Sequence, residues 1–87
     1  MKELKIFYQE RCPFCKKAFR YIEELKEENP AYRNITPVCI EETIEEEYAN
    51  SYDYYYVPTF YIDEVKVHEG GIMKDEVKEI LNRILEP

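Results

Sequence analysis

The stretch Arg11-Cys12-Pro13-Phe14-Cys15-Lys16-Lys17 decides the fold, because a strand pattern leads into it and a helical pattern leaves it. Residues 4–8, Leu-Lys-Ile-Phe-Tyr, are β-prone and apolar in character on both faces, which is typical of a strand buried between helices. After Pro13, apolar side chains recur every three or four residues, which predicts a helix over residues 13–28. Since proline suits the first helical position, we expect Cys12 to cap this helix and Cys15 to lie in its first turn.

The rest of the chain predicts three more strands and two more helices. A strand is expected within residues 34–41, either at a sheet edge or beginning near Val38, because Pro37 cannot donate a ladder hydrogen bond. A short acidic helix over residues 43–52 should turn Ile44 and Tyr48 inward. Two strands joined by a tight Asp63-Glu64 turn, and then a last helix, are expected at residues 59–62, 65–68 and 74–85.

This order, β-α-β-α-β-β-α, predicts a single α/β domain over residues 1–87, with a four-stranded mixed sheet flanked by three helices. Twelve basic residues against 19 acidic ones give a net charge of −7, which disfavours nucleic acid and anionic membranes as partners. No apolar run approaches the ~20 residues that cross a bilayer. We therefore expect a cytoplasmic monomer, and in that reducing compartment three cysteines do not describe a disulfide framework.

Two cysteines separated by two residues at a strand-to-helix junction can alternate between a dithiol and a disulfide. The helix N-terminus, together with Arg11, Lys16 and Lys17, favours the thiolate form of Cys12, which is the attacking species. Cys15, one turn into the helix, should be more buried and suits a resolving role. The same pair could instead supply two ligands to a metal site, or could be inert core cysteines.

Three segments resemble known redox proteins. Residues 6–18, which contain Cys-Pro-Phe-Cys, resemble the active-site segment of glutaredoxins, whose motif is usually Cys-Pro-Tyr-Cys. Val57-Pro58-Thr59 resembles the segment of the thioredoxin superfamily that carries a cis-proline beside the active site. Gly70-Gly71 lies where glutaredoxins have Gly-Gly before the last helix. The resemblance covers essentially the whole chain and implies a thioredoxin fold.

The resemblance also implies a function, a thiol–disulfide oxidoreductase that reduces protein or glutathione mixed disulfides. Cys12 would be the nucleophile and Cys15 the resolving thiol, Pro58 would be cis, and the Val57 backbone would pair with substrate like an added strand. No cofactor or metal need be bound, and glutathione or a reductase would return the electrons. The substrate-binding residues implied are Arg11, Pro13, Phe14, Val57, Pro58, Gly70 and Gly71.

Two departures bear on the electron donor. Many glutaredoxins carry a lysine three residues before the first cysteine, where this chain has Gln9, and an acidic residue closer to Gly-Gly than Asp75 is. The turn after Gly71 looks more like that of thioredoxins. Two other functions stay open, an iron–sulfur or metal carrier without redox turnover, and a binding module whose cysteines are incidental. Cys39 is expected to be a buried, inert thiol.

Overall fold

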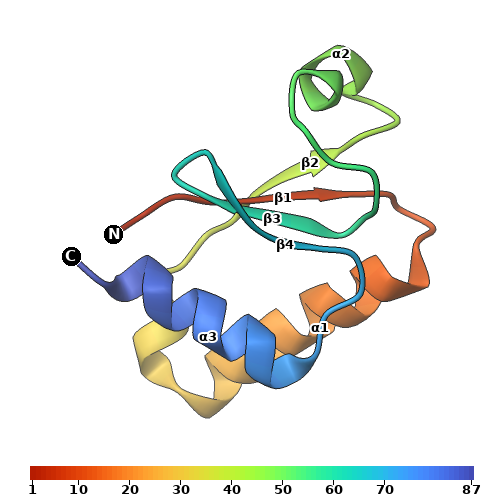
Figure 1. Cartoon of the computed structure of the whole chain (residues 1–87). Coiled ribbons are helices and arrows are strands. Elements are labelled where there is room, and N and C mark those ends of the chain that lie inside the picture. Colours follow the sequence, from red (N-terminus) through yellow and green to blue (C-terminus); the bar gives the residue numbers. More distant parts are fainter.

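Four strands form one sheet in the order β2-β1-β3-β4 in the computed structural model, which describes residues 1–87 (Figure 1). β1 (Leu4–Tyr8) runs parallel to β2 (Val38–Glu41) and antiparallel to β3 (Thr59–Ile62), and β3 runs antiparallel to β4 (Val65–Glu69). The mixed sheet expected from the sequence is therefore confirmed. The second strand satisfies both expectations for it, since β2 lies at an edge and begins at Val38, after Pro37.

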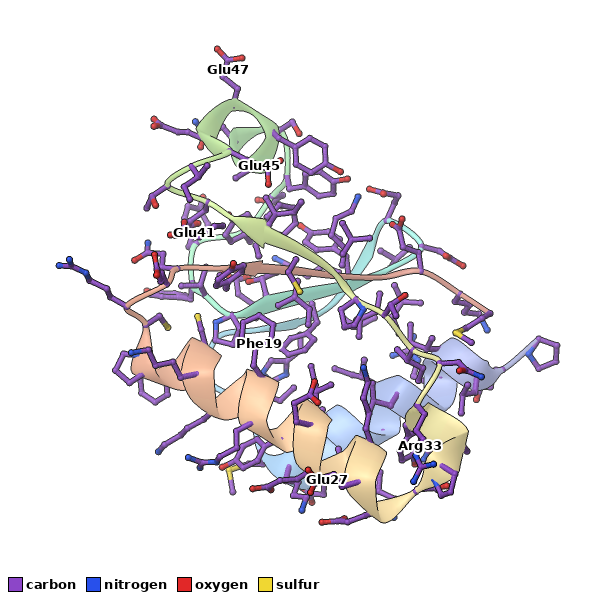
Figure 2. All side chains as sticks on the ribbon, turned by 180° about the vertical axis from the view of Figure 1, so that it is seen from behind. Phe19, Glu27, Arg33, Glu41, Glu45 and Glu47 are labelled. Carbon is purple, nitrogen blue, oxygen red and sulfur yellow. The ribbon has the colours of Figure 1, made fainter.

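Two helices, α1 (Pro13–Glu28) and α3 (Lys74–Leu85), cover one face of the sheet (Figure 1). A single 3-10 turn, η1 (Pro30–Tyr32), follows α1. Their apolar faces meet the sheet in a core of 14 buried residues, and Figure 2 shows Phe19 reaching from α1 toward the strands. Both helices have the bounds that their apolar spacing predicts. Although α3 lacks a polar residue at its cap, the Glu76 carboxylate accepts the Met73 backbone N–H at 3.0 Å.

The other face carries a smaller core under a single short helix, α2 (Glu46–Asn50). The prediction of a helix over residues 43–52 was too long, because the Glu41 carboxylate accepts the N–H and hydroxyl of Thr43 at 2.7 Å and holds a turn there. Ile44 is exposed, so the expectation that it faces inward was wrong. Tyr48 is 41% exposed, but its ring centre lies 6.3 Å from that of buried Phe7 on β1, so it does face the sheet. Ala49 is the residue that α2 buries. Figure 2 shows Glu47 pointing away from the molecule on the outer side of this helix.

A buried lysine ties α2 to the sheet, which the sequence did not indicate. Lys5 on β1 is only 4% exposed, and its ammonium lies 2.6 Å from the Tyr48 and Tyr52 hydroxyls and the Glu64 carboxylate. Burial alone would lower the pKa of Lys5, but the hydrogen bonds to Glu64 and the two tyrosines outweigh it and raise the pKa. The expectation that β1 is apolar on both faces was therefore wrong at Lys5.

The two ends of the chain lie together, at the end of the molecule opposite the β1–α1 loop (Figure 1). The Lys2 backbone N–H donates to the Ile84 carbonyl at 3.0 Å, and its ammonium donates to the Glu86 carbonyl at 3.1 Å. None of the helices combines the length and the apolar character that crossing a membrane requires.

Candidate active site

Cys12 occupies the N-cap of α1, as the sequence predicts. Its backbone is extended, its Sγ accepts the Cys15 N–H at 3.1 Å, and its carbonyl accepts the Lys16 N–H at 3.0 Å. The first turn of a helix has N–H groups without partners inside the helix, and one of them points at this sulfur. A thiolate accepts such a bond more strongly than a thiol does. The start of α1 therefore supplies a hydrogen-bond donor at the Cys12 sulfur.

Cys15 is less accessible than Cys12, and its thiol holds its proton more tightly than an ordinary cysteine does. Cys15 is 1% exposed, whereas Cys12 is partly exposed. Burial, followed by the hydrogen bond with Cys12, raises the pKa of Cys15 to about 12. Cys15 thus keeps its proton at neutral pH. The two thiols are adjacent and free. Cys12 is the accessible thiol, as a nucleophile must be, and Cys15 is the buried one, which suits a resolving thiol.

The peptide bond between Val57 and Pro58 is cis, which confirms the geometry that the resemblance implied. Pro58 is buried, Val57 is half-buried, and the Val57 carbonyl oxygen lies 3.8 Å from the Cys12 sulfur. The segment before β3 therefore forms the second wall of the site. Its backbone faces the nucleophile directly.

The Gly70-Gly71 turn joins this wall to the start of α1. Gly70 has a φ of +90°, a conformation that side chains disfavour, and its N–H donates to the Pro58 carbonyl at 2.8 Å. A Cβ on Gly71 would lie 3.3 Å from the Phe14 ring, so the ring rests on this turn. Phe14 is nonetheless 59% exposed. The structure thus brings together Phe14, Pro58 and both glycines, which the sequence placed in one site.

Unpaired positive charge surrounds the accessible thiol. Arg11, Lys16 and Lys17 are exposed, and none of the three forms an ion pair. Arg11 also lines a shallow hollow of about 210 Å³ together with Gln9 and Glu10, beside the turn after β2. The Gln9 amide is not free, since it donates to the Glu42 carboxylate. A larger hollow of about 420 Å³ lies between α1 and the start of α3, and Cys12 does not line it.

Sequence reasoning missed the residue that holds the loop before Pro58. One oxygen of the Glu69 carboxylate accepts the N–H groups of Tyr55 and Tyr56, at 2.6 and 3.0 Å. Its other oxygen lies 2.7 Å from the Lys66 ammonium. A glutamate at the end of a strand carries no sequence signal for this role, because its partners are 13 and 14 residues away.

The remaining candidate ligands do not join the cysteine pair. No group of three or more His, Cys, Asp or Glu side chains is placed to hold a metal ion within the chain. His68 contacts the Gly71 carbonyl at 2.8 Å. Cys39 is exposed, so the expectation of a buried thiol was wrong. The residue lies on β2, an edge strand that has a neighbouring strand on only one side. Although the residue is exposed, neighbouring atoms desolvate the sulfur enough to raise the pKa of its thiol.

Comparison with known families decides where the chain belongs. The family described as "Thioredoxin domain" matches residues 2–82, nearly the whole chain. The chain belongs to the thioredoxin family. No curated protein is similar enough to the chain to match it. A thioredoxin-like fold in which Cys12 and Cys15 are adjacent supports a thiol–disulfide oxidoreductase.

Solved thioredoxins show the same fold at low identity. A mutant thioredoxin from Halobacterium salinarum is 23% identical, with a TM-score of 0.71 over 99% of this chain and 76% of its own. A thioredoxin-like protein from Clostridium perfringens is 24% identical, with a TM-score of 0.69 over 98% and 71%. The germline-specific thioredoxin Deadhead of Drosophila melanogaster is 15% identical, with a TM-score of 0.69 over 97% and 81%. At these identities, the likeness is one of fold.

Proposed function

We propose that this protein is a dithiol reductant, which reduces disulfides in proteins or in glutathione mixed disulfides through Cys12 and Cys15, with no bound cofactor. The observation that carries the proposal is the difference between the two thiols. Cys12 is accessible and accepts a helix N-terminal N–H at 3.1 Å, whereas Cys15 is buried and keeps its proton. In such a pair, only Cys12 can make the first attack on a substrate disulfide.

In the first step, the Cys12 thiolate attacks one sulfur of a substrate disulfide. A bond forms between the Cys12 sulfur and that sulfur, and the substrate S–S bond breaks. The other substrate sulfur leaves with the electron pair and takes a proton from solvent. The result is a mixed disulfide and one free substrate thiol.

In the second step, Cys15 attacks the Cys12 sulfur of the mixed disulfide. Its high pKa, about 12, means that attack requires loss of its proton, which passes to the departing substrate sulfur. The Cys12–Cys15 disulfide forms, the mixed disulfide breaks, and the second substrate thiol is released. Two electrons have then passed from the protein to the substrate.

Substrate binding is assigned to the walls of the site. The Val57 backbone would pair with an extended polypeptide, because its carbonyl faces Cys12 at 3.8 Å. Arg11, Pro13 and Phe14 would contact it from the α1 side, and Gly70-Gly71 would let its backbone approach closely. Tyr55 and Tyr56, 86% and 71% exposed, add apolar surface next to Val57. These exposed rings favour polypeptide disulfides over small ones.

The electron donor follows from the same surroundings. Gln9 is bonded to Glu42, so the position where many glutaredoxins carry a lysine holds no cation for a glutathione carboxylate. This favours a reductase over glutathione for a monomeric, cytoplasmic protein. The test is to oxidise the protein and compare its reduction by glutathione with that by a thioredoxin reductase. Faster reduction by glutathione at matched reducing potential would contradict the preference.

The central test replaces Cys12 by serine. Reduction of insulin and of a glutathione mixed disulfide, with dithiothreitol as donor, should fall to the uncatalysed rate. Cys39→Ser is the matched control, because Cys39 is a thiol outside the site and its loss should change neither rate. Activity in Cys12→Ser equal to that of the unmodified protein would refute the proposed function.

A further inference from the structure

The segment that presents Val57 to the nucleophile has no regular secondary structure of its own. Residues 53–58 lie between α2 and β3 and form neither helix nor strand. Tyr55 and Tyr56 within it are exposed, so side-chain burial does not fix their backbone. Tyr54 and Val57 pack on the smaller core, so it is the backbone of the two exposed residues between them that must be held by specific contacts with other elements.

Those contacts come mainly from the end of β4. One Glu69 carboxylate oxygen accepts both the Tyr55 and the Tyr56 N–H, the two backbone donors that precede Val57. Lys66 holds the other oxygen at 2.7 Å and also donates to the Asp53 carbonyl at 3.1 Å. The hydroxyl of buried Thr59 donates to the Tyr56 carbonyl, which fixes the same peptide unit from the β3 side.

Charge and sequence position make Glu69 well suited to this contact. Lys66, followed by the two backbone N–H groups, lowers the pKa of Glu69 to about 2, so the carboxylate is ionised throughout the neutral range. Hydrogen bonds to an ionised acceptor are roughly twice as strong as neutral ones. The next residue, Gly70, donates its N–H to the Pro58 carbonyl at 2.8 Å. Consecutive residues of one strand end therefore hold the backbone on both sides of Val57.

We propose that Glu69 is a positioning residue for polypeptide substrates, which holds the Val57 backbone in place for strand pairing through the N–H groups of Tyr55 and Tyr56. The inference rests on the proposed function. Without the carboxylate, the loop would have to be ordered each time a polypeptide binds, and that cost weakens binding. A small disulfide that reacts at Cys12 without backbone pairing makes no such demand. The effect of Glu69 should therefore depend on the substrate.

The experiment compares two disulfides as substrates for one set of variants. The first is a short peptide cyclised by one disulfide, and the second is hydroxyethyl disulfide. Glu69→Ala should raise KM for the peptide about tenfold, since it removes two bonds to a charged acceptor, and should leave kcat within about twofold. The rate with hydroxyethyl disulfide should not change. A role in overall stability alone would slow both substrates together.

Conservative variants separate the loss of the hydrogen-bond acceptor at Glu69 from the loss of its charge. Glu69→Gln keeps one carbonyl oxygen that can accept both N–H groups, but it loses the charge and turns an amide NH2 toward the Lys66 ammonium, so KM for the peptide should rise by less than in Glu69→Ala. Glu69→Asp keeps the charge but is one methylene shorter, so KM should rise. Glu69→Asp also provides the test if Glu69→Ala does not fold. Glu47→Ala, at an exposed glutamate of α2, is the matched control.

Two results would overturn the inference. One is an unchanged peptide KM in both Glu69→Ala and Glu69→Asp. The other is an equal loss of rate with both disulfides. Neither result touches the proposed function, which stands or falls on Cys12→Ser in the same assays.

Discussion

The two walls of the site meet at Cys12 but are held in different ways. On the α1 side, the contacts that place Cys12 and Cys15 join residues no more than four apart, such as the Cys15 N–H and the Cys12 sulfur. On the Val57 side, the anchors come from Glu69 on β4 and Thr59 on β3. One wall is a local structure, whereas the other is an irregular segment fixed by distant charged groups.

Chemistry and recognition can therefore vary independently in this protein. The nucleophile depends on a helix N-terminus, which forms whenever α1 forms. The Val57 wall depends on two charged residues, Glu69 and Lys66, that no short motif specifies. Substitutions on the α1 side should therefore remove chemistry outright, whereas substitutions on the Val57 side should change stability and substrate affinity. The predictions below test that division.

The largest expected effect belongs to the α1 wall, in Cys15→Ser. Without the resolving thiol, the mixed disulfide on Cys12 cannot be displaced from within, so turnover of a peptide disulfide should stop after one event when glutathione is absent. Mass spectrometry should show the peptide bound covalently to the protein. Cys39→Ser should turn over normally in the same experiment. Continued turnover by Cys15→Ser would show that resolution does not need α1.

The next largest effect is expected for Lys5→Ala, on the face of the sheet that α2 covers. The substitution removes the buried side-chain stem of Lys5 and the three hydrogen bonds that its ammonium donates. It should lower the free energy of unfolding by about 2–3 kcal/mol. Lys5→Met keeps the stem and should cost less. Lys78→Ala, on an exposed part of α3, should stay within about 0.5 kcal/mol. Urea denaturation measures all three. Equal stability of Lys5→Ala and Lys78→Ala would mean that this network is not an anchor.

A smaller effect should separate the two glycines that join the walls. Gly70→Ala places a Cβ at a φ of +90° and should cost about 1–2 kcal/mol of unfolding free energy. Gly71→Ala meets only the exposed Phe14 ring, at 3.3 Å, and the ring can move away, so the cost should be below about 0.5 kcal/mol. Thermal denaturation of the pair measures the difference. The opposite order would show that the Phe14 ring is the more rigid contact between the walls.

The smallest effect expected is a pH dependence at Glu69. Its pKa in the folded protein, about 2, lies below the ordinary 4.5, so its stabilising contribution is complete above about pH 4.5 and is lost as the pH falls toward 2. The stability gap between the unmodified protein and Glu69→Gln should therefore close between about pH 5 and pH 2. Denaturation midpoints across that range measure it, and other carboxylates cancel because both proteins contain them. A stability gap that does not change with pH would show that the charge on Glu69 does not stabilise the folded protein.

The α1 wall was predictable because its determinants are local. Pro13 and the apolar spacing after it set the helix, and the helix start sets the position of Cys12. The strands after Pro58 were predictable for the same reason, since β-prone runs flank the Asp63-Glu64 turn, whose residues both adopt positive φ. The cis bond at Pro58 came from the family resemblance and not from the residues around it.

Neither the Lys5 network nor the Val57 wall was predictable, because their contacts depend on which strands become neighbours. Lys5 lies opposite Tyr61 across β1 and β3, and only that register, together with the β3–β4 turn, brings Glu64 to its ammonium. Glu69 reaches Tyr55 only because β4 pairs with β3. Cys39 was misjudged in the same way, since its exposure follows from the place of β2 at the sheet edge. Such contacts and exposures depend on the pairing of all four strands and not on any local stretch of sequence.

The contacts of Lys2 with the last turn of α3 have a consequence for engineering. They keep the two chain ends within one hydrogen bond of each other, at the end of the molecule opposite the β1–α1 loop (Figure 1). A short linker could join those ends, and the chain could be reopened at the exposed turn around Arg33 and Asn34, which borders no part of the site. The resulting circular permutant would keep both walls intact. In the unpermuted chain, proteins fused to the two ends would lie away from the two walls of the site and leave them free to bind substrate.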